Sequence, residues 1–121
     1  VLSHLIGTKH LPNFRESILI IEDIGEAPYR IDRMLTHLRL AGILQQLSGL
    51  GFGSFTSCDM KENLENEQSF KLLDVFRDRT KDLEIPIVSG LPVGHCYGNA
   101  SLPVGSQAIL NGNEGRLSLL L

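Results

Sequence analysis

Residues 18–44 read ILIIEDIGEAPYRIDRMLTHLRLAGIL and contain the clearest strand-to-helix transition in the chain. The stretch opens inside the apolar run 17–22 (SILIIE), which is rich in isoleucine. Short runs of this kind, bounded by polar residues, are typical of a strand buried on both faces. We therefore predict a strand that ends near Glu22, because Asp23 and Gly25 follow it.

A helix is predicted directly after this strand, beginning at Pro28. The fixed φ angle and the missing N–H group of proline suit the first turn of a helix. Apolar residues then recur at helical spacing and predict its buried face: Ile31, Met34, Leu35 and Leu38. The opposite stripe is polar, and Arg30 follows Glu26 at the spacing at which an ion pair can form. We expect the helix to end at Gly42 or Gln45.

The following segments continue the alternation of strands and helices. Residues 47–55 (LSGLGFGSF) predict a strand weakened by its glycines, with Leu50, Phe52 and Phe55 facing a core. Residues 59–68 are rich in aspartate and glutamate and predict a solvated loop.

A second helix and three further strands are predicted in the second half of the chain. Residues 68–83 predict the helix, and its apolar positions are Phe70, Leu72, Leu73, Phe76 and Leu83. Strands are expected over 85–89, 102–110 and 116–121, and the turn 111–115 (NGNEG) favours a hairpin between the last two. The order β-α-β-α-β-β-β predicts an α/β fold with an antiparallel tail.

Composition excludes several classes of protein. A length of 121 residues gives room for one domain. With 42% hydrophobic and 21% charged residues, the chain is neither disordered nor fibrous. Its longest apolar run, 18–21, is far shorter than the roughly 20 residues that span a bilayer, and no secretory signal pattern opens the chain. A net charge of −3 argues against a nucleic-acid partner.

The cysteines and the first residue indicate the setting of the protein. Cys58 and Cys96 are too few for a disulfide framework and lack the spacing of metal ligands. We therefore expect a reduced, cytoplasmic protein without a cofactor. The first residue is Val1 rather than methionine, and we expect the chain to be part of a longer gene product.

Glu22 and His95 are the two candidates for catalysis. Carboxylates at the carboxyl end of a strand in α/β folds often face the functional crevice, which is the predicted place of Glu22. His95 lies in the glycine- and proline-rich loop 90–98, which can present a side chain at the edge of a cleft. Histidine is the usual proton shuttle near neutral pH. Two plain alternatives stay open: Glu22 can meet solvent or pair with an arginine, and His95 can lack a chemical role.

Other charged residues have weaker settings. Asp23 is expected on the opposite face of the strand from Glu22, and Glu26 precedes a helix whose dipole stabilises a carboxylate. Among the remaining histidines, His37 falls on the polar face of the first helix. His4 and His10 fall in an irregular entry segment.

A glutamate–histidine pair supports hydrolysis when a nucleophile completes it. The chain contains no G-x-S-x-G elbow. Ser54 lies inside a glycine-rich strand, Ser89 is followed by no helix, and Cys96 adjoins His95, a position from which productive mutual geometry is rare. None of the three has the strand–turn–helix setting of a nucleophile. The chain therefore offers two members of a triad.

Two further kinds of site are conceivable from the residues present. Glu22, His10 and His95 could hold a metal ion, although no H-x-x-x-H or C-x-x-C spacing supports this. The glycines at 49, 51 and 53 suggest phosphate binding only weakly, because the G-x-x-x-x-G-K-[ST] pattern is missing.

The sequence resembles a known family. Residues 18–44 look like the start of the C-terminal domain of bacterial L,D-carboxypeptidases, a group that includes muramoyltetrapeptide carboxypeptidases and microcin C immunity proteins. The segments 5–8 (LIGT), 51–55 (GFGSF) and 90–95 (GLPVGH) agree with it in order and spacing. The resemblance covers nearly the whole chain and implies a small mixed sheet with flanking helices, similar to a swivelling β/β/α domain.

The resemblance implies a serine protease with a Ser–Glu–His triad, a hydrolase whose serine stands in an N-terminal α/β domain. Its glutamate and histidine positions fall on Glu22 and His95. His95 would be general base and then general acid, and Glu22 would orient the imidazole. The expected reaction removes the terminal D-alanine of murein tetrapeptide in cytoplasmic peptidoglycan recycling. Residues 1–121 would then form a single domain that lacks the N-terminal nucleophile domain, and we expect them to be inactive alone.

Some alternatives stay open at this point. A non-catalytic binding or assembly module with the same fold is the second hypothesis. The substrate could be a murein peptide or a peptidyl-nucleotide antibiotic, and Arg30 or Arg33 could bind its carboxylate. The family also implies a homodimer, whereas neither nucleic acid nor a membrane is an expected partner.

Overall fold

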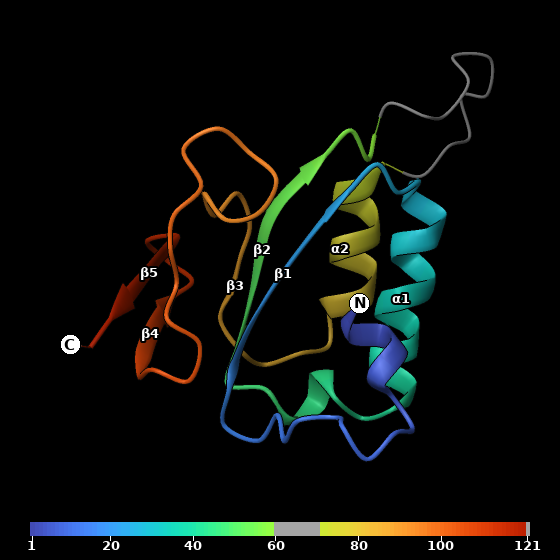
Figure 1. Ribbon diagram of the computed structural model, residues 1–121, viewed down its shortest axis with the longest axis horizontal. Helices are drawn as coiled ribbons and strands as arrows, with labels where there is room; N and C mark the ends of the chain where they lie inside the picture. The colour runs from blue at the N-terminus through green and yellow to red at the C-terminus, as the bar shows by residue number, and fades with distance from the viewer. Residues whose placement is uncertain (60–70, 121) are drawn as a thin grey trace.

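A small parallel sheet organises the protein. The structure, a computed structural model, describes residues 1–59 and 71–120. The strands β1 (Ile18–Ile24), β2 (Gly49–Thr56) and β3 (Ile87–Val88) pair in the order β1-β2-β3, all parallel. The helices α1 (Pro28–Leu40) and α2 (Leu72–Thr80) lie side by side on one face of this sheet (Figure 1). The hairpin of β4 (Ala108–Asn111) and β5 (Arg116–Leu119) lies on its other side.

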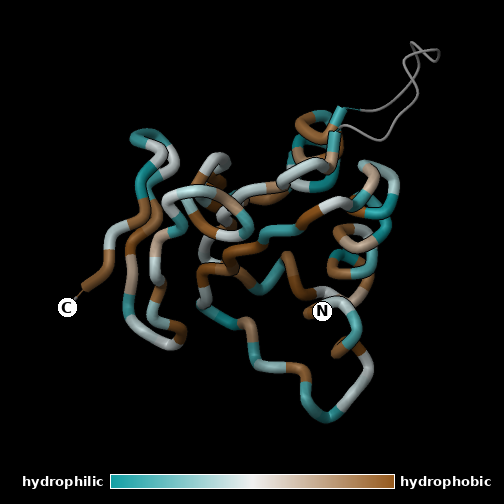
Figure 2. Tube along the Cα trace, turned by 45° about the horizontal axis from the view of Figure 1, so that its top comes forward, coloured by the Kyte–Doolittle hydropathy of each residue, from teal (hydrophilic) through white to brown (hydrophobic). Residues whose placement is uncertain are grey.

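This arrangement confirms the predicted α/β class. The parallel strands form one sheet and the antiparallel pair forms another, so the predicted antiparallel tail is a separate hairpin. Two short 3-10 helices, η1 (Leu2–Leu5) and η2 (Leu44–Gln46), complete the described elements. In Figure 2 the hydrophobic stretches lie along the middle of the molecule, whereas several outer turns are hydrophilic.

Strand β1 separates two apolar cores. Leu19 and Ile21 pack against the large core beneath the helices. Ile18 and Ile20 pack against the smaller core beneath the hairpin. Because successive side chains of a strand point to opposite faces, one run of isoleucine and leucine serves both cores. The expected burial on both faces is thus partial, since each of these four side chains is half-buried.

The end of β1 differs from the prediction. The strand continues past Glu22, because Asp23 pairs with Phe55 and Ile24 pairs with Thr56 of β2. The ladder shifts register between Ile21 and Asp23, where β2 has one residue more than β1. Polar residues did not end the strand, because their backbones found partners in β2.

Helix α1 has the predicted start and end. Pro28 occupies its first turn, and its buried apolar residues are Ile31, Leu35 and Leu38. Gly42 follows the helix with a φ of +70°, a conformation that glycine adopts without strain. The N–H of Gly42 donates to the Arg39 carbonyl and that of Ile43 to the Leu38 carbonyl. This is the Schellman pattern that closes many helices.

Helix α2 is shorter than predicted and presents a different face. Its buried residues are Leu72, Val75, Phe76 and Thr80, whereas Leu73 is 55% exposed. The expectation that Leu73 lies in the buried stripe was wrong, because the face at helical spacing runs from Leu72 through Phe76. Leu83 lies beyond the helix and is half-buried. The expected position of Phe70 and the acidic loop 59–68, apart from Asp59, lie outside the described residues.

The other strands are shorter than their predicted ranges. The strand expected over 47–55 begins at Gly49, because η2 and Leu47 precede it. Of the predicted range 85–89, only β3 is a strand. The strand predicted over 102–110 begins at Ala108 and ends one residue late, at Asn111, and that predicted over 116–121 ends at Leu119 among the described residues. Each keeps only the residues that find a paired backbone.

Three phenylalanines join the sheet to α2. The rings of Phe52 and Phe76 are stacked with centroids 3.9 Å apart, and Phe55 meets Phe76 edge-on at 4.9 Å. The register shift in β2 brings Phe55 to the face that Phe52 occupies, although three residues separate them. The predicted core positions Leu50 and Phe52 are fully buried, and Phe55 is half-buried.

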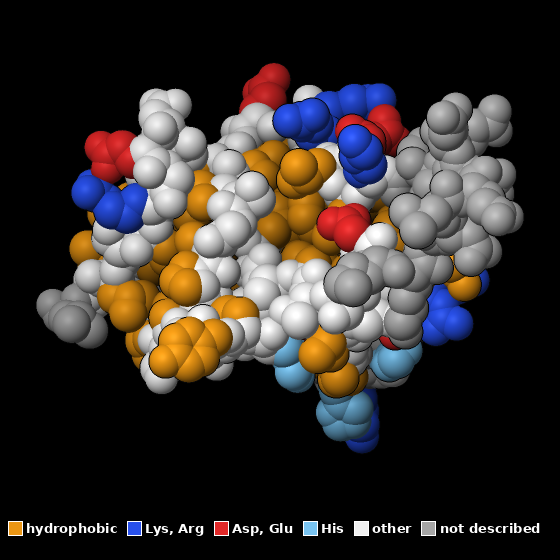
Figure 3. Space-filling model, turned by 90° about the horizontal axis from the view of Figure 1, so that it is seen from above, with side chains coloured by type: hydrophobic (Ala, Val, Ile, Leu, Met, Phe, Trp, Pro, Cys, Tyr) orange, Lys and Arg blue, Asp and Glu red, His pale blue; other side chains and the backbone are white. Residues whose placement is uncertain are grey.

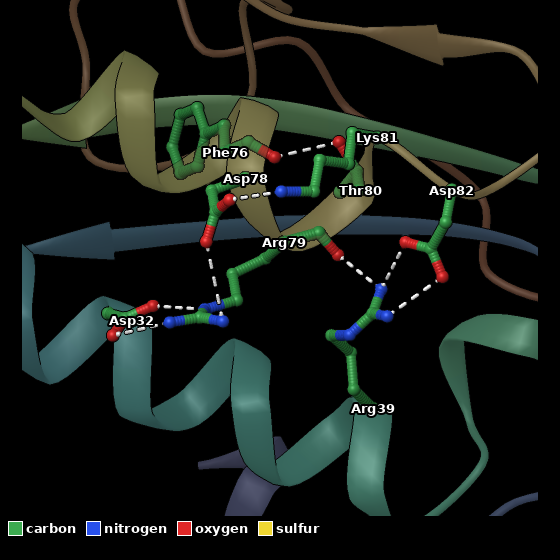
Figure 4. A network of polar contacts seen from close by, with 8 residues as sticks. All are labelled: Asp32, Arg39, Phe76, Asp78, Arg79, Thr80, Lys81 and Asp82. Carbon is green, nitrogen blue, oxygen red and sulfur yellow. Dashed lines mark hydrogen bonds and ion pairs between the residues drawn. The ribbon is translucent and has the colours of Figure 1, made fainter.

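Ion pairs join the two helices on their outer side (Figure 4). The guanidinium of Arg79 pairs with Asp32 of α1. Arg39 of α1 donates to both carboxylate oxygens of Asp82 at 2.8 Å and to the Arg79 carbonyl at 2.7 Å. The predicted pair of Arg30 and Glu26 is also present, at 3.3 Å.

No helix in the described ranges is long and apolar enough to cross a membrane.

Substitution of Phe76 tests the packing of α2 on the sheet. We expect Phe76→Ala to lower the free energy of unfolding by about 3–5 kcal/mol, because it removes a buried ring stacked on Phe52. Leu73→Ala on the same helix is the matched control, and its cost should stay below about 1 kcal/mol because Leu73 is exposed. Urea denaturation measures both values. Equal costs would contradict the observed face of α2.

The pair of Arg39 and Asp82 predicts a dependence of stability on acid. The hydrogen bonds from Arg39 hold the pKa of the Asp82 carboxyl below its ordinary value. The stabilisation is therefore present above the unfolded pKa of about 3.9 and is lost as the pH falls through the folded pKa. We expect Asp82→Asn to lower the urea midpoint at pH 7, and the difference from wild type to shrink toward pH 2. The exposed Glu84→Gln should show no such difference at either pH.

Candidate active site

The structure brings Glu22 and His95 together. The Nδ1 atom of His95 lies 2.8 Å from Oε2 of Glu22, although 73 residues separate them in the chain. The backbone N–H of His95 donates to the same oxygen at 3.2 Å. Two groups of one residue thus converge on one carboxylate oxygen, which fixes both the loop and the ring.

The loop after β3 reaches Glu22 because it runs beside β2. The N–H of Leu91 donates to the Phe52 carbonyl at 3.1 Å, and the N–H of Ser54 donates to the Val93 carbonyl at 2.8 Å. Further along, the Thr56 hydroxyl donates to the His95 carbonyl at 2.5 Å. These bonds extend the path of β3 along the edge of β2 and place His95 beside the carboxyl end of β1.

Gly94 is required by both its backbone and its surroundings. Its φ is +115°, a region that residues with a side chain rarely adopt. A Cβ atom at this position would lie 2.5 Å from Oε2 of Glu22 and 2.6 Å from Oγ of Ser54. The close approach of the loop to Glu22 therefore depends on the missing side chain.

The bulge in β2 lies directly opposite Glu22. Gly53 and Ser54 together face this one residue of β1, because Ile21 pairs with Phe52 and Asp23 pairs with Phe55. Bulges of this type redirect side chains and are frequent beside active sites. Here the bulge turns Ser54 toward Glu22.

The geometry suits transfer of a proton at Nε2 of His95. When Nδ1–H donates to the carboxylate, Nε2 is the basic nitrogen and can accept a proton from a hydroxyl. The carboxylate also stabilises the imidazolium that results. The His95 side chain is 57% exposed and that of Glu22 is 31% exposed, so the ring is open to an approaching group.

The other acidic and histidine candidates lie apart from this pair. Asp23 accepts a hydrogen bond from the N–H of Ile24 at 2.8 Å, and Glu26 is held by Arg30. The remaining histidines, His4, His10 and His37, are exposed. Within residues 1–59 and 71–120, no three His, Cys, Asp or Glu side chains are arranged to hold a metal ion. The metal-site alternative with Glu22, His10 and His95 has no support there.

None of the three candidate nucleophiles engages the His95 ring. Ser54 is turned toward Glu22, and Ser89 is exposed. Cys96 is half-buried and directly follows His95 in the chain. In the described part of the chain, no hydroxyl or thiol is hydrogen-bonded to that ring. The pair therefore stands without a partner for nucleophilic attack among these residues.

The glycines of β2 serve packing. A Cβ at Gly49 would lie 3.0 Å from Leu110, and one at Gly51 would collide with Ile20 and Leu91. A Cβ at Gly53 would collide with the Val93 carbonyl. These glycines let neighbouring segments approach the face of β2 that carries the smaller core. They lie in a strand and not in a loop, so the phosphate-binding hypothesis has no support.

The sequence did not predict that two residues of β2, Ser54 and Thr56, lie beside the pair. Thr56 holds the His95 carbonyl, and Ser54 lies next to the carboxylate of Glu22. Their positions depend on the bulge and on the path of a distant loop, and neither feature leaves a local signal in the sequence.

Comparison with known proteins identifies the family of the chain. Residues 1–110 match the family described as the LD-carboxypeptidase C-terminal domain. A putative carboxypeptidase of Synechocystis is 46% identical over 120 residues, covering 99% of this chain and 39% of that protein. The murein tetrapeptide carboxypeptidase of Pseudomonas aeruginosa is 36% identical over 111 residues, covering 92% of this chain and 34% of that protein.

Solved structures show the same fold. The crystal structure of a muramoyltetrapeptide carboxypeptidase from Oxalobacter formigenes has a TM-score of 0.84 at 35% identity, covering 98% of this chain and 40% of that one. A microcin self-immunity protein has a TM-score of 0.81 at 20% identity, which shows a shared fold alone. The chain thus spans between 34% and 40% of the length of these relatives. On this evidence the chain belongs to the LD-carboxypeptidase family, and residues 1–110 correspond to the C-terminal domain of that family.

Proposed function

We propose that this chain supplies the base and its orienting acid to a serine-type L,D-carboxypeptidase that removes the terminal D-alanine of murein tetrapeptide. The observation that carries the proposal is the 2.8 Å contact between Nδ1 of His95 and Oε2 of Glu22. The pair lies beside the carboxyl end of β1, the edge at which α/β folds hold their functional groups. The names of the relatives from Pseudomonas and Oxalobacter supply the substrate class.

The two residues have distinct roles in the proposed reaction. Nε2 of His95 takes the proton of a serine hydroxyl as its oxygen attacks the carbonyl before D-alanine. The same proton passes to the amine of D-alanine as the C–N bond breaks. His95 then activates the water that hydrolyses the acyl-enzyme. Glu22 keeps Nδ1 protonated throughout and stabilises the imidazolium in each step.

The nucleophile in this proposal lies in the part of the relatives that residues 1–121 do not match. Support comes from the described residues, in which no hydroxyl or thiol is bonded to the His95 ring. Tyr97 and Val104, both in the segment after β3, are fully exposed. Figure 3 looks onto the end of the molecule toward which β2 runs, and hydrophobic side chains are exposed across its middle. An N-terminal nucleophile domain that covers this face would bury the hydrophobic side chains seen there.

We propose a murein peptide as the substrate and a reducing cytoplasm as the setting. Identities of 35% and 36% to two murein carboxypeptidases, against 20% to a microcin self-immunity protein, favour a murein peptide. Cys58 and Cys96 are free, as suits peptidoglycan recycling in a reducing cytoplasm. A homodimer stays a prediction, which the sedimentation of the full-length gene product would measure.

Variants of the pair in the full-length gene product test the proposed function. We expect Glu22→Gln and His95→Gln each to lower kcat for D-alanine release by about 10³- to 10⁴-fold, because each removes a member of the proton relay. His37→Gln, an exposed histidine of α1, is the control and should keep the wild-type rate. If both variants of the pair also keep it, the chain is a binding or assembly module.

The isolated 121 residues provide a second test. We expect them to release no D-alanine from murein tetrapeptide, because the attacking hydroxyl is proposed to lie elsewhere in the gene product. The full-length gene product at equal concentration serves as the positive control. Release by the isolated chain, abolished in its own His95→Gln variant, would place the nucleophile within these residues and overturn this part of the proposal.

Gly94→Ala tests whether the close approach of the loop is required. A Cβ at this position would push against both Glu22 and Ser54, so we expect kcat/KM of the full-length gene product to fall by about 100-fold or more. Gly98→Ala is the matched control, since Gly98 also has a positive φ, +77°, but open space around it. The loss should be much smaller there. Equal losses would assign the effect to backbone strain alone.

A further inference from the structure

The hydroxyl of Ser54 is a buried polar group beside the Glu22–His95 pair. The Oγ atom of Ser54 is inaccessible to solvent, and it has no hydrogen-bond partner among the described residues. Buried polar atoms in native proteins are nearly always hydrogen-bonded, and each exception calls for an explanation. The backbone of Ser54 is fixed by its N–H bond to the Val93 carbonyl, so only the side-chain torsions can bring the hydroxyl to a partner.

The carboxylate of Glu22 is the acceptor that we consider for the Ser54 hydroxyl. A Cβ built on Gly94 would lie 2.5 Å from Oε2 of Glu22 and 2.6 Å from Oγ of Ser54. The two oxygens can be no farther apart than the sum of these distances, which one bridging water can span. The bulge of β2 sets Ser54 opposite Glu22 in the ladder, so the proximity follows from the backbone.

Glu22 has the capacity for another donor. A carboxylate offers about four acceptor sites, and the ring and backbone of His95 occupy Oε2 alone. Both of these donors come from one element, the loop that carries His95. A donor from β2 would hold the carboxylate against the sheet independently of that loop.

We propose that Ser54 is a positioning residue, whose hydroxyl donates a hydrogen bond to the Glu22 carboxylate, directly or through one water. This inference rests on the proposed function, because Glu22 matters to the reaction only as the group that orients His95. Ser54 acts through Glu22 and does not touch the substrate. The bulge in β2 then brings Ser54 to the carboxylate of Glu22.

Three variants of Ser54 in the full-length gene product test this role. Ser54→Ala and Ser54→Val remove the hydroxyl, and we expect each to lower kcat by about tenfold with KM changed by less than about twofold. Ser54→Thr keeps the hydroxyl at the size of valine, so it should retain most of the wild-type kcat. The exposed Ser48→Ala, just before β2, is the control and should match wild type.

The contrast between threonine and valine separates positioning from packing. If Ser54 only filled space, these two variants would behave alike, and Ser54→Ala would leave kcat unchanged. Either result overturns the inference. A rise of KM in place of the fall in kcat would assign Ser54 to substrate binding and would overturn it too.

A second measurement keeps this inference separate from the proposed function. We expect the hydrogen-bonded Nδ1–H of His95 to give a low-field proton resonance in the NMR spectrum, which is identified by its loss in His95→Gln. We expect this resonance to shift in Ser54→Ala and to keep its position in Ser54→Thr. If Glu22→Gln and His95→Gln keep full activity, the proposed function fails, and this resonance still tests the Ser54 contact. An unchanged resonance in Ser54→Ala overturns the contact itself.

Discussion

Parallel pairing of three strands is the constraint on which the rest of the molecule depends. Because β1, β2 and β3 run the same way, each connection must return along a face of the sheet, and the helices α1 and α2 make those returns. The carboxyl ends of the strands then meet at one edge. Glu22 from β1 and His95 from the loop after β3 arrive there from opposite sides of β2. Their contact across 73 residues is a consequence of strand direction.

The pair also depends on the absence of side chains around it. Gly53 lets the Val93 carbonyl reach β2, and Gly94 lets the loop close over Glu22. The bulge at residues 53 and 54 changes which side chains of β2 point to which face of the sheet. As a result Phe55 joins Phe52 in the core, while Ser54 turns toward Glu22. One irregularity in the ladder thus serves the packing of α2 and the surroundings of the acid. A regular strand would satisfy only one of these two demands.

Local signals predicted what local physics determines. Pro28 and Gly42 mark the ends of α1, and the isoleucine run marks β1, because capping and apolar periodicity act within a few residues. Glu22 and His95 were identified as candidates from their predicted places in a strand and a glycine-rich loop. The buried face of α2, which excludes Leu73, and the short β3 were not predictable in this way. They are set by pairing and packing with segments far away in the chain, and so is the position of Ser54.

The exposure of the His95 ring suggests how a separate nucleophile domain would affect the Glu22–His95 pair. The helices cover one face of the sheet and the hairpin covers the other, while 57% of the His95 side chain and 31% of the Glu22 side chain remain accessible. In water an ion pair at this distance is weak, and a lower local dielectric strengthens it several-fold. A domain that brought a serine to Nε2 would also exclude water from the pair. The same docking event would then deliver the nucleophile and strengthen the interaction that stabilises the imidazolium, so the base would become effective only when its partner is in place.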